Sequence, residues 1–130
     1  MVMRRVRISD RAQREYQADL ELAGQRASLV SAAGDAEQAF RAAQASGAAA
    51  EERYRLAVEL DAALSAAVRA AYAAQRAEIG PRGYMDRIYR RKKLATPAVH
   101  ALTAQAEHLL TLRETHRLNS IPDIPFSRAG

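Results

Sequence analysis

Alanine constrains the fold of this chain more than any other residue. It occupies 30 of the 130 positions, whereas Leu, Ile, Val and Phe together occupy 25. Alanine has the highest helix propensity, and the Arg, Glu and Gln residues between the alanines also favour helices. The composition therefore predicts an all-α fold with thin side chains at the helix contacts, and it argues against β-sandwiches and α/β sheets. The absence of cysteine excludes disulfide scaffolds and thiol chemistry.

Glycine and proline divide the chain into predicted helices. Ser46-Gly47 interrupts the apolar pattern, Gly80-Pro81 ends a helix because proline disfavours the helical conformation at the preceding residue, and Thr96-Pro97 is a helix-start signal. We therefore expect a helical domain over residues 9–118, with helices at about 10–45, 48–79, 84–94 and 97–118. It is flanked by a basic N-terminal arm, residues 1–8, and an extended, proline-containing C-terminal arm, residues 119–130.

The first two predicted helices have similar lengths. At a rise of 1.5 Å per residue, residues 10–45 span about 54 Å and residues 48–79 about 48 Å, so a short turn between them gives a long antiparallel hairpin. Apolar positions in the first helix recur about every 3.4 residues, which is close to the heptad spacing of a coiled coil. Ser9 or Asp10 is its expected N-cap. Gly34 inside it marks either a kink or a break.

The later helices have apolar faces of different widths. The second helix carries apolar residues on a face broad enough to meet two neighbours. The short helix over 84–94 is expected to point Met85, Ile88, Tyr89 and Leu94 inward, and it is followed by a third long helix with one apolar side.

The formal charge of +5 at pH 7 is unevenly distributed. Residues 80–95 contain six basic residues against one acidic residue, and residues 1–8 contain three arginines, whereas the rest of the chain is slightly acidic. Such patches point to nucleic acid or to an acidic protein surface. The residues predicted to make this contact are Arg4, Arg5, Arg7, Arg82, Tyr84, Arg87, Tyr89, Arg90, Arg91, Lys92 and Lys93.

The segment from Arg82 to Lys93 has three interpretations. Its cations are interleaved with two tyrosines, so charge and a base-stacking surface would coincide if it met nucleic acid. It would equally suit docking on an acidic partner, or it is a solvated helix end. The loop Gly80–Gly83 resembles the GxxG loop of KH domains, but that fold needs a sheet, so we interpret the loop as a turn between helices.

No catalytic or metal-binding motif occurs in the sequence. The three histidines at 100, 108 and 116 are eight residues apart on one predicted helix, about 12 Å and 80° from one another, so no two can share a metal ion within one chain. We expect them to be solvated. Carboxylates pair with arginines at helical spacing, as in Glu37–Arg41 and Glu51–Arg55. We therefore expect no enzymatic activity, no metal, no cofactor and no small-molecule substrate.

The C-terminal arm carries Ile121, Ile124 and Phe126 between two prolines. These side chains either cap the protein's own bundle or occupy a groove on a neighbouring subunit, and we expect the intersubunit contact. No uncharged run is long enough to cross a bilayer, and residues 1–8 lack an apolar signal region, so we expect no membrane contact and a cytoplasmic location, or the virion if the gene is phage-encoded.

These features together predict a non-enzymatic helical subunit of a larger, homo-oligomeric assembly, because a core made largely of alanine buries little apolar area in a monomer. In its layout of compact helices with extended arms, the chain resembles bacteriophage head-to-tail adaptor (connector) proteins, and the resemblance implies a virion component whose arms dock on adjacent rings. The alternatives are a small nucleic-acid-binding regulator that uses residues 82–93, and a helical adaptor or inhibitor that binds one protein.

Overall fold

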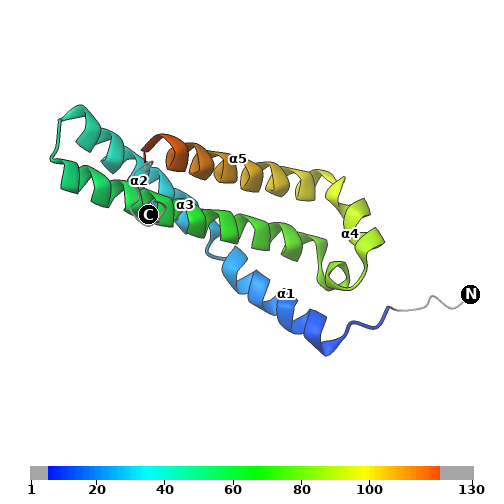
Figure 1. Cartoon of the computed structure of the whole chain (residues 1–130). Helices are drawn as coiled ribbons and strands as arrows, with labels where there is room; N and C mark the ends of the chain where they lie inside the picture. The colour runs from blue at the N-terminus through cyan, green and yellow to red at the C-terminus, as the bar shows by residue number, and fades with distance from the viewer. Residues whose placement is uncertain (1–5, 121–130) are drawn as a thin grey trace, which may run out of the picture. The chain divides into compact units, whose positions relative to one another are not determined.

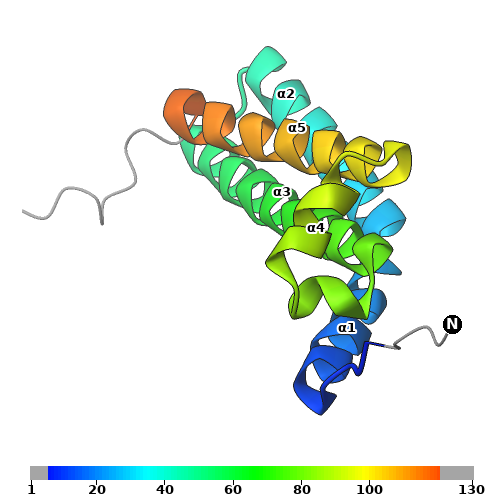
Figure 2. The ribbon, with the colours of Figure 1, turned by 90° about the vertical axis from the view of Figure 1, so that its right-hand side faces the viewer.

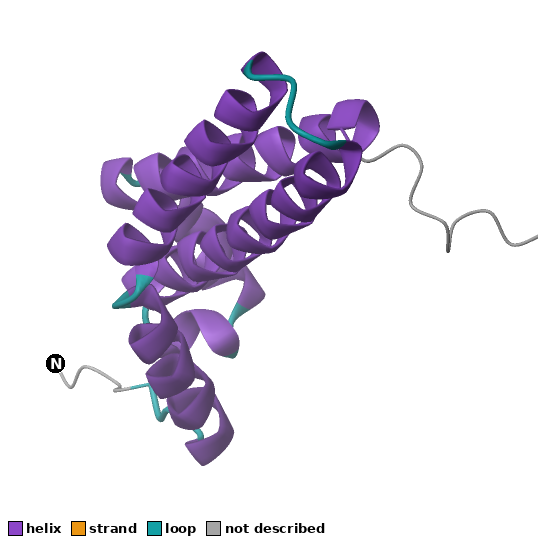
Figure 3. Cartoon of the chain, turned by 90° about the vertical axis from the view of Figure 1, so that its left-hand side faces the viewer, coloured by secondary structure: helices purple, strands orange, loops and turns teal. Residues whose placement is uncertain are grey.

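The structure, a computed structural model, describes residues 6–120 as helices joined by short turns (Figure 1). In chain order they are α1 (Asp10–Ala23), α2 (Arg26–Ala45), α3 (Ala50–Ile79), the 3-10 turn η1 (Pro81–Tyr84), α4 (Arg87–Leu94) and α5 (Pro97–Ser120). The turned views in Figure 2 and Figure 3 show helices and loops and no strand over these residues. The all-α expectation is confirmed.

The helices form two compact units. Unit 1 contains the described residues of Met1–Arg26 together with Arg69–Ala106, and unit 2 contains Ala27–Val68 together with the described residues of Glu107–Gly130. α1, η1 and α4 therefore belong to unit 1, and α2 belongs to unit 2 from Ala27 onward. α3 and α5 each contribute residues to both units.

The predicted helix over 10–45 is divided into α1 and α2 at Gly24-Gln25, whereas Gly34 lies inside α2 without interrupting it. The Gly24 N–H donates to the Leu20 carbonyl and the Gln25 N–H to the Leu22 carbonyl, both at 3.0 Å, so α1 ends in a tight turn. Both glycines weaken a helix similarly. The break lies close to the boundary between the units, which falls between Arg26 and Ala27, whereas Gly34 lies within unit 2.

The helix ends follow from local hydrogen bonds. Ser9 is the N-cap of α1, because its Oγ accepts a hydrogen bond from the Ala12 N–H at 3.1 Å. Pro97 is the first residue of α5, as predicted. The Thr96 hydroxyl, however, donates to the Lys93 carbonyl at 2.7 Å, so the Thr96 side chain caps the end of α4. The backbone carbonyl of Thr96 accepts from the His100 N–H at 2.8 Å, which is the first hydrogen bond of α5.

Alanine lines the core of both units. Phe40, Leu60, Leu64 and Leu109 are large apolar side chains that unit 2 buries. The residues with no exposed surface are Ala67, Ala70, Ala71, Ala73 and Ala106. Alanine lets helix backbones approach closely, but each methyl group removes little apolar area from water.

The predicted ion pairs are partly confirmed. Arg41 lies 3.7 Å from Glu37, four residues before it. Arg55 pairs with Glu52 and Glu59 and not with Glu51, so that prediction was wrong. Positions three and four residues away both face Arg55 along the helix, and Arg55 uses the two carboxylates on either side of it.

Replacing each of two glycines of unit 2 by alanine should change the free energy of unfolding in opposite directions. Gly47 ends α2 with a φ of 67°, and the Ala48 N–H donates to the Ala43 carbonyl at 3.0 Å, the bond of a Schellman motif. We expect Gly47→Ala to lower the free energy of unfolding by about 1–2 kcal/mol, because a Cβ is strained at this φ.

Gly34 is the matched control, because it lies inside α2 and a Cβ there meets nothing within 4 Å. Gly34→Ala should raise the free energy of unfolding by about 0.5–1 kcal/mol through helix propensity. Urea unfolding followed by circular dichroism measures both changes. A Gly47→Ala variant as stable as the wild type would contradict the assigned turn.

Candidate interaction surface on helix α4

The basic segment folds into η1 and α4, which connect α3 to α5 (Figure 2). Gly80, at a φ of 98°, ends α3, and Pro81 starts η1. Asp86 is the N-cap of α4, because its carboxylate accepts from the Tyr89 N–H at 2.9 Å. This backbone hydrogen bond, with Arg82 as a further cause, holds the pKa of the Asp86 carboxyl below its usual value.

Tyr84 anchors η1 to the rest of unit 1. Its hydroxyl donates a hydrogen bond to the carboxylate of Asp19 on α1. The same carboxylate accepts from Arg76 of α3 at 2.8 and 3.1 Å, a two-point ion pair. The ring of Tyr16 meets the ring of Tyr84 edge to face, with centroids 6.4 Å apart. One carboxylate therefore joins α1, α3 and η1.

The environment of this cluster keeps it in one protonation state at neutral pH. Burial raises the pKa of the Asp19 carboxyl, but hydrogen bonds from Arg76 and Tyr84 outweigh burial and hold that pKa below its usual value. Burial first, and then the hydrogen bond to Asp19, raise the pKa of the Tyr84 hydroxyl far above its usual value. Asp19 is therefore an ionised acceptor and Tyr84 a neutral donor.

Three of the six cations in the basic segment Arg82 to Lys93 have roles inside unit 1. The Arg82 guanidinium lies 4.5 Å from the centroid of the Tyr89 ring and pairs with Asp86 at 3.3 Å. The Lys93 ammonium lies 5.4 Å from the same centroid, and Arg90 donates to the Gly83 carbonyl at 3.0 Å. Cation–π contacts and charge-assisted hydrogen bonds of this kind hold η1 and α4 together.

The other three cations, Arg87, Arg91 and Lys92, are exposed and have no hydrogen-bond or ion-pair partner among residues 6–120. At about 100° per residue they cover an arc of about 140° on α4, and Ile88 lies between Arg91 and Lys92 on that arc. Ile88 is 69% exposed. We call these four residues the α4 face.

The expectation that Met85, Ile88 and Leu94 point inward was wrong, because all three are exposed. Tyr89 alone of that set is half-buried. The inner side of α4 is occupied by the contacts of Arg82, Arg90 and Lys93 described above, so polar and cation–π interactions take the place of an apolar core in this short helix.

The remaining predicted contact residues lie elsewhere. Arg7 is exposed in the segment before α1. Arg4 and Arg5, and the intersubunit candidates Ile121, Ile124 and Phe126, lie outside the described residues. The two tyrosine rings of the basic segment are not free to stack on bases, because the Tyr84 ring contacts the Tyr16 ring and the Tyr89 ring faces two cations.

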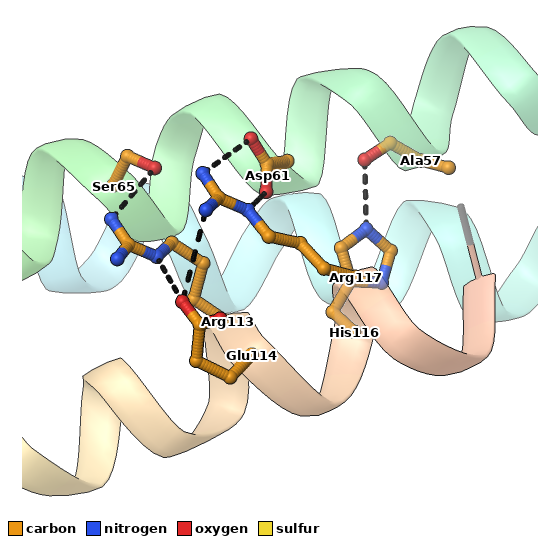
Figure 4. Close-up of polar contacts among 7 residues, drawn as sticks. All are labelled: Ala57, Asp61, Ser65, Arg113, Glu114, His116 and Arg117. Carbon is orange, nitrogen blue, oxygen red and sulfur yellow. Dashed lines mark hydrogen bonds and ion pairs between the residues drawn. The ribbon is translucent and has the colours of Figure 1, made fainter. Parts of the chain in front are cut away.

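In unit 2, α5 contacts α3 through a row of polar groups (Figure 4). Arg113 donates to Ser65, Arg117 to Asp61 at 2.6 Å, and His116 Nε2 lies 2.8 Å from the Ala57 carbonyl oxygen. His116 is therefore buried, also against the ring of Phe40 at 5.3 Å, and the expectation of a solvated histidine was wrong at this position. His100 and His108 are exposed.

Neither metal binding nor membrane insertion is indicated over residues 6–120. No group of three or more His, Cys, Asp or Glu side chains in this range is placed to hold a metal ion. None of its helices has the length and apolar character needed to cross a bilayer.

Asp19 and Arg76 were missed by sequence reasoning. They lie 57 residues apart, and Asp19 lies 65 residues from Tyr84, so no local spacing connects them.

Comparisons of the chain with protein-family models, with curated proteins and with solved structures found no match.

Replacing the carboxylate of Asp19 should lower the free energy of unfolding at neutral pH. It should also make that free energy change less between neutral and acid pH. Its folded-state pKa is lowered, so the cluster stabilises the fold above the unfolded-state pKa of about 3.9 and loses this effect as the pH falls through the folded-state value. We expect Asp19→Asn to lower the free energy of unfolding by about 1–2 kcal/mol at pH 7, and the difference from the wild type to shrink below about pH 4.

Asp35→Asn is the control, because Asp35 is an exposed carboxylate without a partner among residues 6–120. It should change stability by less than about 0.5 kcal/mol at any pH. Urea unfolding at pH 3, 5 and 7 measures these differences, and an Asp19→Asn variant that behaves like Asp35→Asn would refute the role of the cluster.

Proposed function

We propose that this protein is a non-enzymatic helical subunit of a larger, homo-oligomeric assembly, in which exposed helix faces and the terminal segments bind neighbouring subunits. A head-to-tail connector of a phage virion is the assembly whose layout this proposal follows. An adaptor that binds one protein partner would use the same side chains.

The observation that carries the proposal is the contrast between the core and the surface. Alanines fill the core, while large apolar side chains lie exposed. Tyr54 and Val58 of α3 are 48% and 42% exposed and lie four residues apart, on one face of the helix. Leu118 of α5 is 77% exposed. Covering such side chains with another subunit would add the apolar burial that an alanine core lacks.

The α4 face supports the same proposal. Its three unpartnered cations surround an exposed isoleucine, which suits a protein surface that offers carboxylates around an apolar contact. Ile88 would supply the apolar contact, and the cations would set orientation and speed of association.

Nucleic-acid binding is the second candidate, and the cations Arg87, Arg91 and Lys92 favour it. Since the tyrosine rings are engaged inside unit 1, such binding would depend on phosphate contacts alone. Three phosphate contacts give a slope of about −2.7 for log affinity against log salt on duplex DNA.

Absolute mass tests the proposed assembly. Protein purified at high salt with nuclease should have a mass that is a defined multiple of the 14.3 kDa chain, measured by light scattering after size exclusion. We expect Tyr54→Ser/Val58→Ser to lower that mass without loss of helical circular dichroism, because both side chains are exposed. A wild-type monomer at every concentration measured would refute the proposal.

Charge removal on α4 separates protein binding from nucleic-acid binding. If the α4 face binds a neighbouring subunit, the variant Arg87→Gln/Arg91→Gln/Lys92→Gln should lose oligomeric mass in the absence of DNA. If the second candidate holds, this variant should lose retention of a duplex fragment at low salt. The matched control Arg14→Gln/Arg53→Gln/Arg69→Gln removes the same charge from exposed arginines elsewhere, so equal loss in both variants would indicate net charge and not the α4 face.

A further inference from the structure

Unit 2 contains a groove that its own helices leave open. It lies between α2, α3 and α5 and has a volume of about 480 Å³. Phe40, Leu60, Leu64 and Leu112 supply its apolar lining. Phe40, Leu60 and Leu64 are buried, so the groove has a packed apolar floor. A volume of this size accommodates several apolar side chains.

The groove opens at the end of the last described helix. Asn119 and Ser120, the final residues of α5, line it, and so does Gln44 near the end of α2. In sequence, the ten residues 121–130 follow directly after this helix end. An extended segment of ten residues reaches about 33 Å, whereas the groove runs about 12 Å along α5 from Ser120 back to Leu112.

The composition of residues 121–130 fits this groove. Ile121, Ile124 and Phe126 are apolar, and two prolines restrict the conformations that the segment loses on binding. Asp123 would offer a second carboxylate to Arg41, which lines the groove, is exposed and already pairs with Glu37 at 3.7 Å. In an extended segment, Ile124 and Phe126 are two residues apart and so point to the same side.

We propose that this groove is the docking site for residues 121–130 of a neighbouring copy of the chain, with Ile124 and Phe126 over Phe40 and Leu64. Binding to the segment's own groove would require the chain to reverse within residues 121–124, which leaves fewer apolar side chains for the contact. Exchange between copies needs no reversal and leaves all three available. This inference rests on the proposed homo-oligomer and names the contact that its C-terminal segment makes.

Because the chain contains no cysteine, introduced cysteines can report this contact in the full-length protein. Gln44 lines the groove and is exposed, and Ser127 lies next to Phe126 in sequence. We would mix a copy that carries only Gln44→Cys with a copy that carries only Ser127→Cys and oxidise the mixture mildly. A disulfide forms only when the two Cβ atoms come within about 4.5 Å. We expect a covalent dimer of the two different variants.

Gln38→Cys is the matched control, since it is an exposed glutamine on α2 about 120° around the helix from Gln44. It should give severalfold less heterodimer with Ser127→Cys, and adding Phe126→Ser should reduce the Gln44 yield to the same level. Equal yields at positions 38 and 44 would overturn the proposal.

The double variant Gln44→Cys/Ser127→Cys reports the source of the segment. Monomers closed by an internal disulfide, without covalent dimers, would overturn the proposal in favour of the chain's own segment. Light scattering on unoxidised protein measures the assembly separately. A multimer without the Gln44–Ser127 link would refute this docking site and leave the proposed assembly intact, whereas a monomer would refute both.

Discussion

Close packing of alanine on α3 is the constraint on which the rest of the structure depends. Alanine methyl groups let a neighbouring helix approach closely, but they are nearly interchangeable and select no single register. Hydrogen bonds supply the register. In unit 1, Gln75 donates to Thr103 at 2.7 Å, and in unit 2, Arg117 and His116 bond to α3. A shift of one residue along these helices would leave buried polar atoms unpaired, which costs far more than moving one methyl group past another.

In unit 1, an ion pair and a hydrogen bond hold helices together beside the alanine core. Where α1, α3 and η1 meet, the carboxylate of Asp19 joins them through Arg76 and Tyr84. Its side chain is only 14% exposed, so the ion pair is shielded from solvent more than an ordinary surface pair. The fold thereby depends on one acid whose removal would leave a tyrosine hydroxyl and an arginine without their partner.

Sequence reasoning found the helices and most of their ends, because glycine at 47, glycine-proline at 80–81 and proline at 97 act locally. It failed where the outcome depends on contacts between distant segments. Gly24 and Gly34 have the same helix propensity, so propensity alone does not predict that the helix ends at Gly24. The inner side of α4 was assigned from apolar periodicity, although Met85, Ile88 and Leu94 are exposed. The position of the basic segment follows from the sequence alone, but which of its cations lack a partner among residues 6–120 required the structure.

Of the six cations in the basic segment, Arg82, Arg90 and Lys93 contact groups inside unit 1. The three cations of the α4 face have no partner among residues 6–120. This division determines what the surface can recognise. With Tyr84 against Tyr16 and Tyr89 facing Arg82 and Lys93, neither tyrosine of the basic segment is free to stack on bases, so contact of this segment with nucleic acid would be confined to phosphates and would carry little sequence preference. An exposed isoleucine adds nothing to a phosphate contact. Against a protein, Ile88 would bury apolar area while the cations around it met carboxylates, so the α4 face suits an acidic protein surface better than a nucleic-acid backbone.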